Sequence, residues 1–141
     1  MTPAFNPLGM SPELREQLKV EIALNERELK ALEQQKIGIH QQAQAKMKLN
    51  EMHMGYDDLV ILHKPFTPST PECSEEQWRY EGMSPKGRLL MQERDGIGRE
   101  AGARIAQIEV AEERLKMLIA QQKAMLDNQG KMVSLAGSLP S

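Results

Sequence analysis

Apolar residues recur at alternating steps of four and three along two long segments of this chain. In the first segment the recurring positions are Leu14, Leu18, Ile22, Asn25, Leu29, Leu32, Lys36, Ile39 and Ala43, and the alternation holds from Leu18 onward. In the second segment they are Ile97, Ala101, Arg104, Ile108, Ala111, Leu115, Leu118, Gln122 and Met125. This heptad spacing puts most of the apolar side chains on one stripe of a helix and is typical of coiled coils. Each segment therefore predicts a long amphipathic helix.

Residues typical of helix boundaries flank both segments. Ser11-Pro12 and Ser84-Pro85 each place a serine before a proline. Serine is a favoured N-cap, and proline is favoured at the first helical position. Gly55 and Gly130 follow the two segments, where a glycine commonly ends a helix.

The predicted fold class is all-α: a long antiparallel two-helix hairpin, coiled-coil-like, with an irregular loop segment at one end and extended termini. An antiparallel register is expected in which opposed residue numbers sum to about 140, so that Leu29 faces Ala111 and Ile22 faces Leu118. The predicted parts are an N-terminal arm over 1–10, a hairpin over 11–130 (helix 11–54, loop segment 55–83, helix 84–128) and a C-terminal tail over 131–141.

Three glycines lie inside the second predicted helix, where each costs about 1 kcal/mol relative to alanine. They are Gly96, Gly98 and Gly102. The expected register sets Gly38 beside Ala101 and Gly102, which predicts close helix packing at these three positions. The alternative is a break or kink of the helix near Gly96.

The loop segment contains the longest aliphatic run of the chain, Leu59–Leu62. The β-branched Val60 and Ile61 would suit a short strand, and a buried helical turn is the alternative. Further along, Ser74–Gln77 has the form of a capping box and predicts a short helix through Tyr80.

Apolar side chains concentrate in this loop segment, and we predict that they form an interface with another protein. The predicted interface residues are Leu59, Val60, Ile61, Leu62, Phe66 and Trp78. Aliphatic and aromatic side chains of this kind contribute most of the binding energy in protein interfaces. The alternative is that the aliphatic run folds back over the ends of the two long helices as a plug.

Composition narrows the class of protein. The chain has 141 residues, a formal net charge of −2, one cysteine and five aromatic residues. This charge gives no general attraction to nucleic acid, and one cysteine excludes a disulfide within the chain. The first residues lack the pattern of a secretory signal peptide, and no stretch predicts a membrane span. The expected location is a virion or the cytoplasm.

No catalytic, cofactor or metal site is predicted. The intervals between His40, His53, His63 and Cys73 match no zinc-binding pattern. The glycines near residue 100 do not follow a predicted strand, as a dinucleotide-binding loop requires. No nucleophile and base arrangement is recognisable either.

These observations favour a protein that acts through protein interfaces. The expected function is that of a non-enzymatic structural or assembly subunit, a homo-oligomer or part of a larger complex, with a phage-type virion component as its most specific form. The alternative is a soluble helical-hairpin chaperone or export adaptor that binds a client protein. No family motif in the sequence supports either function, and both are inferred from the predicted architecture.

Overall fold

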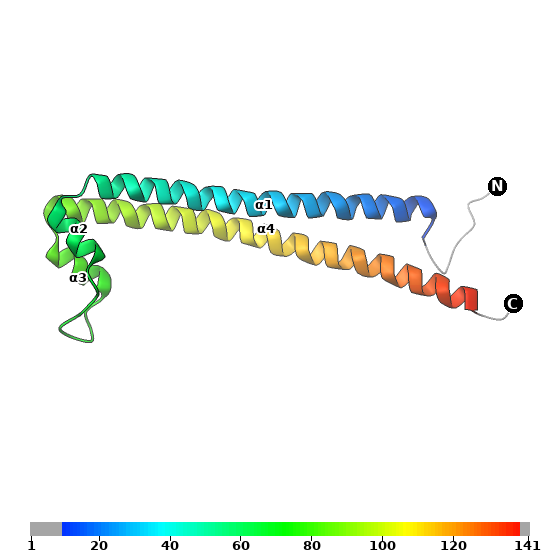
Figure 1. The fold of residues 1–141 in the computed structure, drawn as a ribbon. Helices are drawn as coiled ribbons and strands as arrows, with labels where there is room; N and C mark the ends of the chain where they lie inside the picture. Colours follow the sequence, from blue (N-terminus) through cyan, green and yellow to red (C-terminus); the bar gives the residue numbers. More distant parts are fainter. Residues whose placement is uncertain (1–9, 139–141) are drawn as a thin grey trace. The chain divides into compact units, whose positions relative to one another are not determined.

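The computed structural model describes residues 10–138, and it describes side chains through residue 128. Its helices, in chain order, are α1 (Pro12–Met52), α2 (Tyr56–His63), α3 (Glu75–Gly82) and α4 (Pro85–Ser138). Helices α1 and α4 pack against each other, and the short helices lie between them in the chain, so the fold is a helical hairpin (Figure 1). The predicted all-α hairpin is confirmed. Most of the predicted N-terminal arm (1–9) and the end of the predicted tail (139–141) lie outside the described residues.

Serine side chains cap three of the helices. In each case the hydroxyl oxygen accepts a hydrogen bond from the backbone N–H three residues later, which satisfies a donor that the first turn leaves without a helical partner. The three bonds are Leu14 N to Ser11 Oγ (3.2 Å), Gln77 N to Ser74 Oγ (3.1 Å) and Gly87 N to Ser84 Oγ (3.0 Å). The predicted helix starts are therefore confirmed.

Helix α4 is continuous through its glycines and extends further than expected. It has no break near Gly96, and it contains Gly130 and continues to Ser138, where an extended tail was expected from residue 131. A glycine ends a helix most effectively when it adopts positive φ. No described glycine does so. Gly55, at φ −71° and ψ 162°, is the N-cap of α2.

The segment between the long helices contains two short helices that contact each other, α2 and α3. The aliphatic run Leu59–Leu62 lies in α2, so the helical alternative is confirmed and the strand interpretation is wrong. A strand needs a partner for its backbone hydrogen bonds, and the described part of the chain contains no strand that could pair with this run. The helix satisfies these groups internally.

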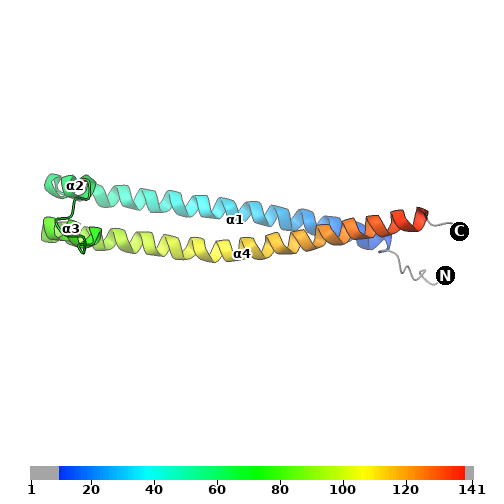
Figure 2. The ribbon, with the colours of Figure 1, turned by 90° about the horizontal axis from the view of Figure 1, so that it is seen from below.

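By its contacts the chain divides into two units, which are described separately. Unit 1 comprises residues 1–35 and 107–141, and unit 2 comprises residues 36–106. In each unit a stretch of α1 lies beside a stretch of α4 (Figures 1 and 2).

The core of unit 1 shows that the buried stripe of α4 includes Gln122 as predicted but contains Ile119 in place of Leu118. Leu18, Ile22 and Ile119 form the buried cluster. Ile119 is 7% exposed, whereas Leu118, the residue predicted to face α1, is 41% exposed. The observed stripe also keeps a heptad spacing, and it buries the β-branched Ile119 in place of Leu118.

Polar contacts in unit 1 define the register of the two helices. The Asn25 amide nitrogen donates to Gln122 Oε1 at 3.1 Å, and Lys123 Nζ lies 3.0 Å from Glu26 Oε1. The expected register would have placed Leu115 opposite Asn25. In this unit the register therefore differs from the prediction, because an asparagine and a glutamine satisfy each other at the interface.

Three glycines of unit 2, Gly38, Gly96 and Gly102, do not mark a close approach of α1 and α4. A Cβ atom on Gly38, Gly96 or Gly102 would meet no heavy atom within 4 Å. The close packing expected at Gly38 and Gly102 is therefore not seen at either glycine. Ala101 is half-buried and lies near Ile39.

Candidate functional site

The predicted interface residues divide into two groups in the structure. Three of them, Leu59, Ile61 and Leu62, are half-buried and pack against a methionine cluster. The methionine cluster consists of Met54, Met83 and Met91, all buried, with Tyr80 and Leu90 also packed against it. Because methionine is flexible and unbranched, it fills irregular spaces between short helices. For these three residues the structure matches the plug alternative.

The other predicted interface residues lie nearer the surface. Val60 and Phe66 are exposed and Trp78 is half-buried. The rings of Phe66 and Trp78 meet edge to face, with centroids 5.5 Å apart and an interplanar angle of 75°. Lys64 Nζ and Arg79 Cζ lie 5.8 Å and 5.5 Å from the centroid of the Trp78 ring. The pair is an aromatic surface with cations beside it.

Arg79 joins α3 to the end of α2. Its Nη1 atom donates to three backbone carbonyl oxygens, those of Ile61 (2.6 Å), Leu62 (3.0 Å) and Lys64 (3.0 Å). Its Nη2 atom lies 2.7 Å from Glu75 Oε1. The last carbonyls of a helix have no helical partner, so one guanidinium satisfies several of them. This role could not be predicted, because no local spacing in the sequence shows that residue 79 reaches residue 61.

Asp58 joins α2 to the beginning of α4. Its buried carboxylate accepts hydrogen bonds from Ser84 N (2.9 Å) and Ser84 Oγ (2.5 Å). The bond from the Ser84 hydroxyl, and after it the bond from the Ser84 N–H, hold the pKa of Asp58 below its usual value. Burial opposes this shift of the pKa, and the positive charge of Lys86 adds to it. A Cβ on Gly87 would lie 2.5 Å from the Asp58 carboxyl group, so glycine leaves the space that the carboxylate occupies.

Polar contacts also join α1 to α4 in unit 2. The side chain of Asn50 is only 1% exposed, and its Nδ2 atom donates to Leu90 O at 2.9 Å and to Glu93 Oε2 at 3.3 Å. Arg94 Nη1 donates to Met47 O at 3.3 Å and lies 3.3 Å from Glu51 Oε1. These contacts join the last turns of α1 to the first turns of α4.

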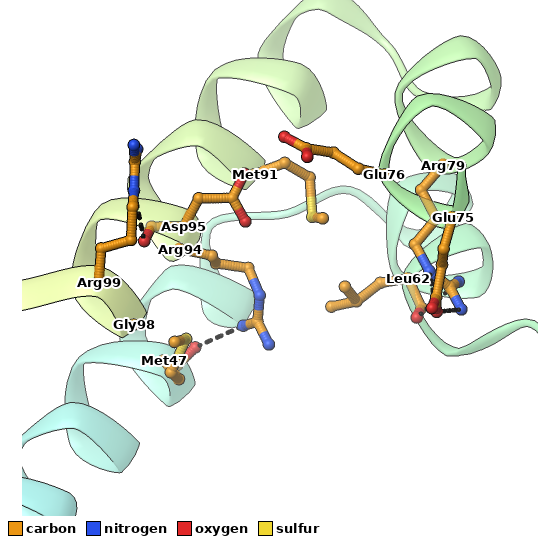
Figure 3. Close-up of a pocket in the computed structure, with 10 residues that line it drawn as sticks. All are labelled: Met47, Leu62, Glu75, Glu76, Arg79, Met91, Arg94, Asp95, Gly98 and Arg99. Atoms are coloured by element: carbon orange, nitrogen blue, oxygen red, sulfur yellow. Dashed lines mark hydrogen bonds and ion pairs between the residues drawn. The ribbon is translucent and has the colours of Figure 1, made fainter. Parts of the chain in front are cut away.

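A groove of about 710 Å³ lies in unit 2, between α3 and the two long helices (Figure 3). Its apolar lining comes from Met47, Leu62 and Met91. Its polar lining comes from Glu75, Glu76, Arg79, Arg94, Asp95 and Arg99, with Gly98 at one side. The groove therefore presents apolar surface and charges of both signs.

The described part of the chain does not bring metal-binding side chains together. Among the described residues, no three His, Cys, Asp or Glu side chains lie close enough to share a metal ion. His63 Nε2 lies 3.9 Å from Glu51 Oε1, and Cys73 is a half-buried free thiol. None of the described helices is long and apolar enough to cross a membrane.

Unit 1 presents a second apolar surface on α4, on a side of the helix that does not contribute to the core. It consists of Val110, Met117, Leu118 and Met125, and we call it the outer stripe. Val110 is 53% exposed, Met117 63% and Met125 51%. Leu118 and Met125 were predicted in the buried stripe, because the adjacent positions Ile119 and Leu126 are also apolar and continue a heptad equally well.

Comparison of the chain with known protein families, with curated proteins and with solved structures found no significant match.

Proposed function

We propose that this protein is a non-enzymatic structural or assembly subunit that acts through its helical surfaces in a larger complex. The observation that carries the proposal is the outer stripe of α4. Large apolar side chains that remain exposed along one helix lose a favourable burial energy of about 1.5–3 kcal/mol each. Such surfaces are normally covered by a partner.

The spacing within the outer stripe supports a helical partner. Val110 and Met117 are seven residues apart, and so are Leu118 and Met125. Positions that repeat every seven residues stay on one side of a helix that takes part in a coiled coil. A second helix lying along α4 would therefore contact the whole stripe.

The most specific form of the proposal is a component of a phage-type virion. Such a particle needs many copies of a small subunit that bind one another through repeated surfaces. A long helical hairpin with exposed apolar side chains suits this role.

A second candidate, a chaperone or export adaptor that binds a client, is favoured by the groove of unit 2. Methionine side chains adapt their shape to different ligands, and Met47 and Met91 line this groove. A client-binding hairpin would function as a monomer or dimer, whereas an assembly subunit forms a ring or a higher oligomer.

The mass of the full chain in solution tests the proposal. Sedimentation velocity from nanomolar to high micromolar concentration should show a higher oligomer for the wild type. The double variant Met117→Glu with Leu118→Glu should remain a monomer with unchanged circular dichroism, because each charge would be buried in the interface.

A matched control keeps the change of charge and leaves the outer stripe intact. Gln107→Glu with Gln121→Glu adds the same charge at exposed polar positions of α4, and it should assemble like the wild type. A wild-type chain that stays monomeric at every concentration would contradict assembly by self-association and favour the client-binding candidate.

A further inference from the structure

We infer that the groove of unit 2 binds a segment of a partner protein in which an aliphatic side chain lies next to a lysine or arginine. This site is separate from the outer stripe of α4 and does not depend on self-association. It adds a partner chemistry to the proposed function.

The size and apolar lining of the groove suit an aliphatic side chain. Its volume of about 710 Å³ falls within the usual range of binding sites, about 300–1,000 Å³. Met47, Leu62 and Met91 come from three different helices and converge on it (Figure 3). Unbranched methionines can adjust to a leucine, isoleucine or methionine of a partner.

Three of the six charged side chains that line the groove, Glu75, Arg79 and Arg94, form ion pairs within the chain. Arg79 pairs with Glu75 at 2.7 Å and binds the carbonyls at the end of α2. Arg94 pairs with Glu51 at 3.3 Å. These two arginines are therefore not free to bind an acidic partner.

Two carboxylates of the groove are not neutralised in this way. Among the described residues, none forms a hydrogen bond or ion pair with the carboxylate of Glu76 or of Asp95. Arg99 Nε lies 3.4 Å from the backbone oxygen of Asp95 instead (Figure 3). Figure 3 shows the Glu76 side chain extending from α3 toward the side of the groove formed by α4, which carries Asp95.

Both carboxylates act on the same neighbour. After burial, the negative charges of Asp95 and Glu76 are the next causes that raise the pKa of Tyr80, and Arg99 opposes them. The two carboxylates and the single Arg99 leave this side of the groove net negative. A lysine or arginine from a partner would relieve the repulsion between the carboxylates, whereas an acidic peptide or a phosphate would increase it.

The chemistry of the occupant follows from this arrangement. The apolar lining and the carboxylates lie side by side, so neighbouring side chains of one polypeptide segment can contact both. A leucine would enter between the methionines while the next basic residue meets Glu76 and Asp95.

The test is a titration of the full chain, labelled with carbon-13 at its methionine methyl groups, with short peptides. The probe is the peptide Gly-Leu-Leu-Lys-Lys-Gly, blocked at both ends. Its controls are Gly-Leu-Leu-Glu-Glu-Gly and Gly-Ser-Ser-Lys-Lys-Gly. The probe should shift the methyl signals of Met47 and Met91 and bind about fivefold or more tightly than either control.

One double variant and one matched pair of single variants locate the binding. Replacing Glu76 by Gln together with Asp95 by Asn should weaken binding of the probe about fivefold and remove its dependence on salt. Gly98→Leu should fill the groove and abolish binding, and it should leave the fold intact because a Cβ there lies 3.9 Å from Met47 Cε. Gly102→Leu, the same change where a Cβ meets nothing within 4 Å, is the matched control and should bind normally.

Three results would overturn the inference: no methyl shift at millimolar probe, equal binding of the lysine and glutamate peptides, or shifts at Met117 and Met125 that persist in Gly98→Leu. None of these results affects the oligomeric state measured for the outer-stripe variants. The two proposals therefore fail independently.

Discussion

The contact between Asp58 and Gly87 offers a sharp test of how α2 is attached to α4. We consider the variants Asp58→Ala and Gly87→Ala, separately and combined. Asp58→Ala removes the acceptor of two hydrogen bonds from Ser84. Hydrogen bonds to a charged group contribute about 1.5–3 kcal/mol each. Because Ser84 is exposed and water can replace part of the loss, we expect a total cost of about 2–4 kcal/mol.

The effect of Gly87→Ala should depend on Asp58. In the wild type the new Cβ would lie 2.5 Å from the carboxyl group. The carboxylate cannot move away without breaking its bonds to Ser84, so overpacking should cost about 1–3 kcal/mol, partly offset by about 1 kcal/mol of helix propensity. When Asp58 is alanine, the same substitution should stabilise the protein by about 0.5–1 kcal/mol.

The predicted coupling energy between the two sites is therefore about 1–3 kcal/mol. Urea unfolding of the four proteins, followed by circular dichroism and by the fluorescence of the single tryptophan, Trp78, measures it. Asp57→Ala changes an exposed carboxylate in the same turn and should cost at most about 1 kcal/mol. A coupling energy of zero would refute the contact.

The carboxylate of Asp58 should make the free energy of unfolding depend on pH in the acidic range. The pKa of Asp58 is lower in the folded protein than in the unfolded chain. Its contribution is therefore complete above the unfolded pKa and is lost as the pH falls from there through the folded pKa. Asp58→Asn should lose less stability than the wild type over this acidic range, as measured by urea unfolding at a series of pH values.

Two further substitutions test other parts of the structure. Gly102→Ala should raise the free energy of unfolding by about 0.5–1 kcal/mol, because a Cβ there meets no atom within 4 Å; a loss of stability in a thermal melt would show that the helices do approach closely at this position. Arg79→Lys should destabilise by about 1–3 kcal/mol in urea, because one ammonium cannot reproduce the guanidinium bonds to three carbonyls and Glu75; a lysine variant as stable as the wild type would contradict this role.

Local signals in the sequence predicted the helices well. The heptad repeats predicted α1 and α4, and the serines before them predicted where these helices start, because capping depends on residues only three positions apart. The capping box at Ser74 likewise predicted α3. These features depend on short-range chemistry that a sequence displays directly.

The heptad pattern alone could not show which of two adjacent residues of α4, Leu118 or Ile119, is buried. Leu118 and Ile119 are adjacent and both apolar, so either continues a heptad. What separates them is the packing of unit 1, where Ile119 joins Leu18 and Ile22. Close approach at Gly38 and Gly102 was inferred from the expected register, and it is not seen even though Ile39 and Ala101 lie near each other.

The attachment of the short helices depends on contacts between residues distant in the chain. Asp58 bonds to Ser84, and Arg79 bonds to the end of α2. Nothing in their local sequence distinguishes these two side chains from solvated charges. The groove could not be predicted either, because its lining residues come from four helices that are distant in the chain.

Oxidation of the methionines, followed by mass spectrometry over a range of protein concentrations, tests most directly whether the outer stripe is an assembly surface. Met52 is 78% exposed and lies outside the stripe, whereas Met83 is buried. In dilute solution Met117 and Met125 should be oxidised nearly as fast as Met52 and much faster than Met83. As the protein assembles, these two should become protected while Met52 stays reactive. If Met117 and Met125 remain as reactive as Met52 in the assembled protein, the outer stripe is not the surface through which it assembles.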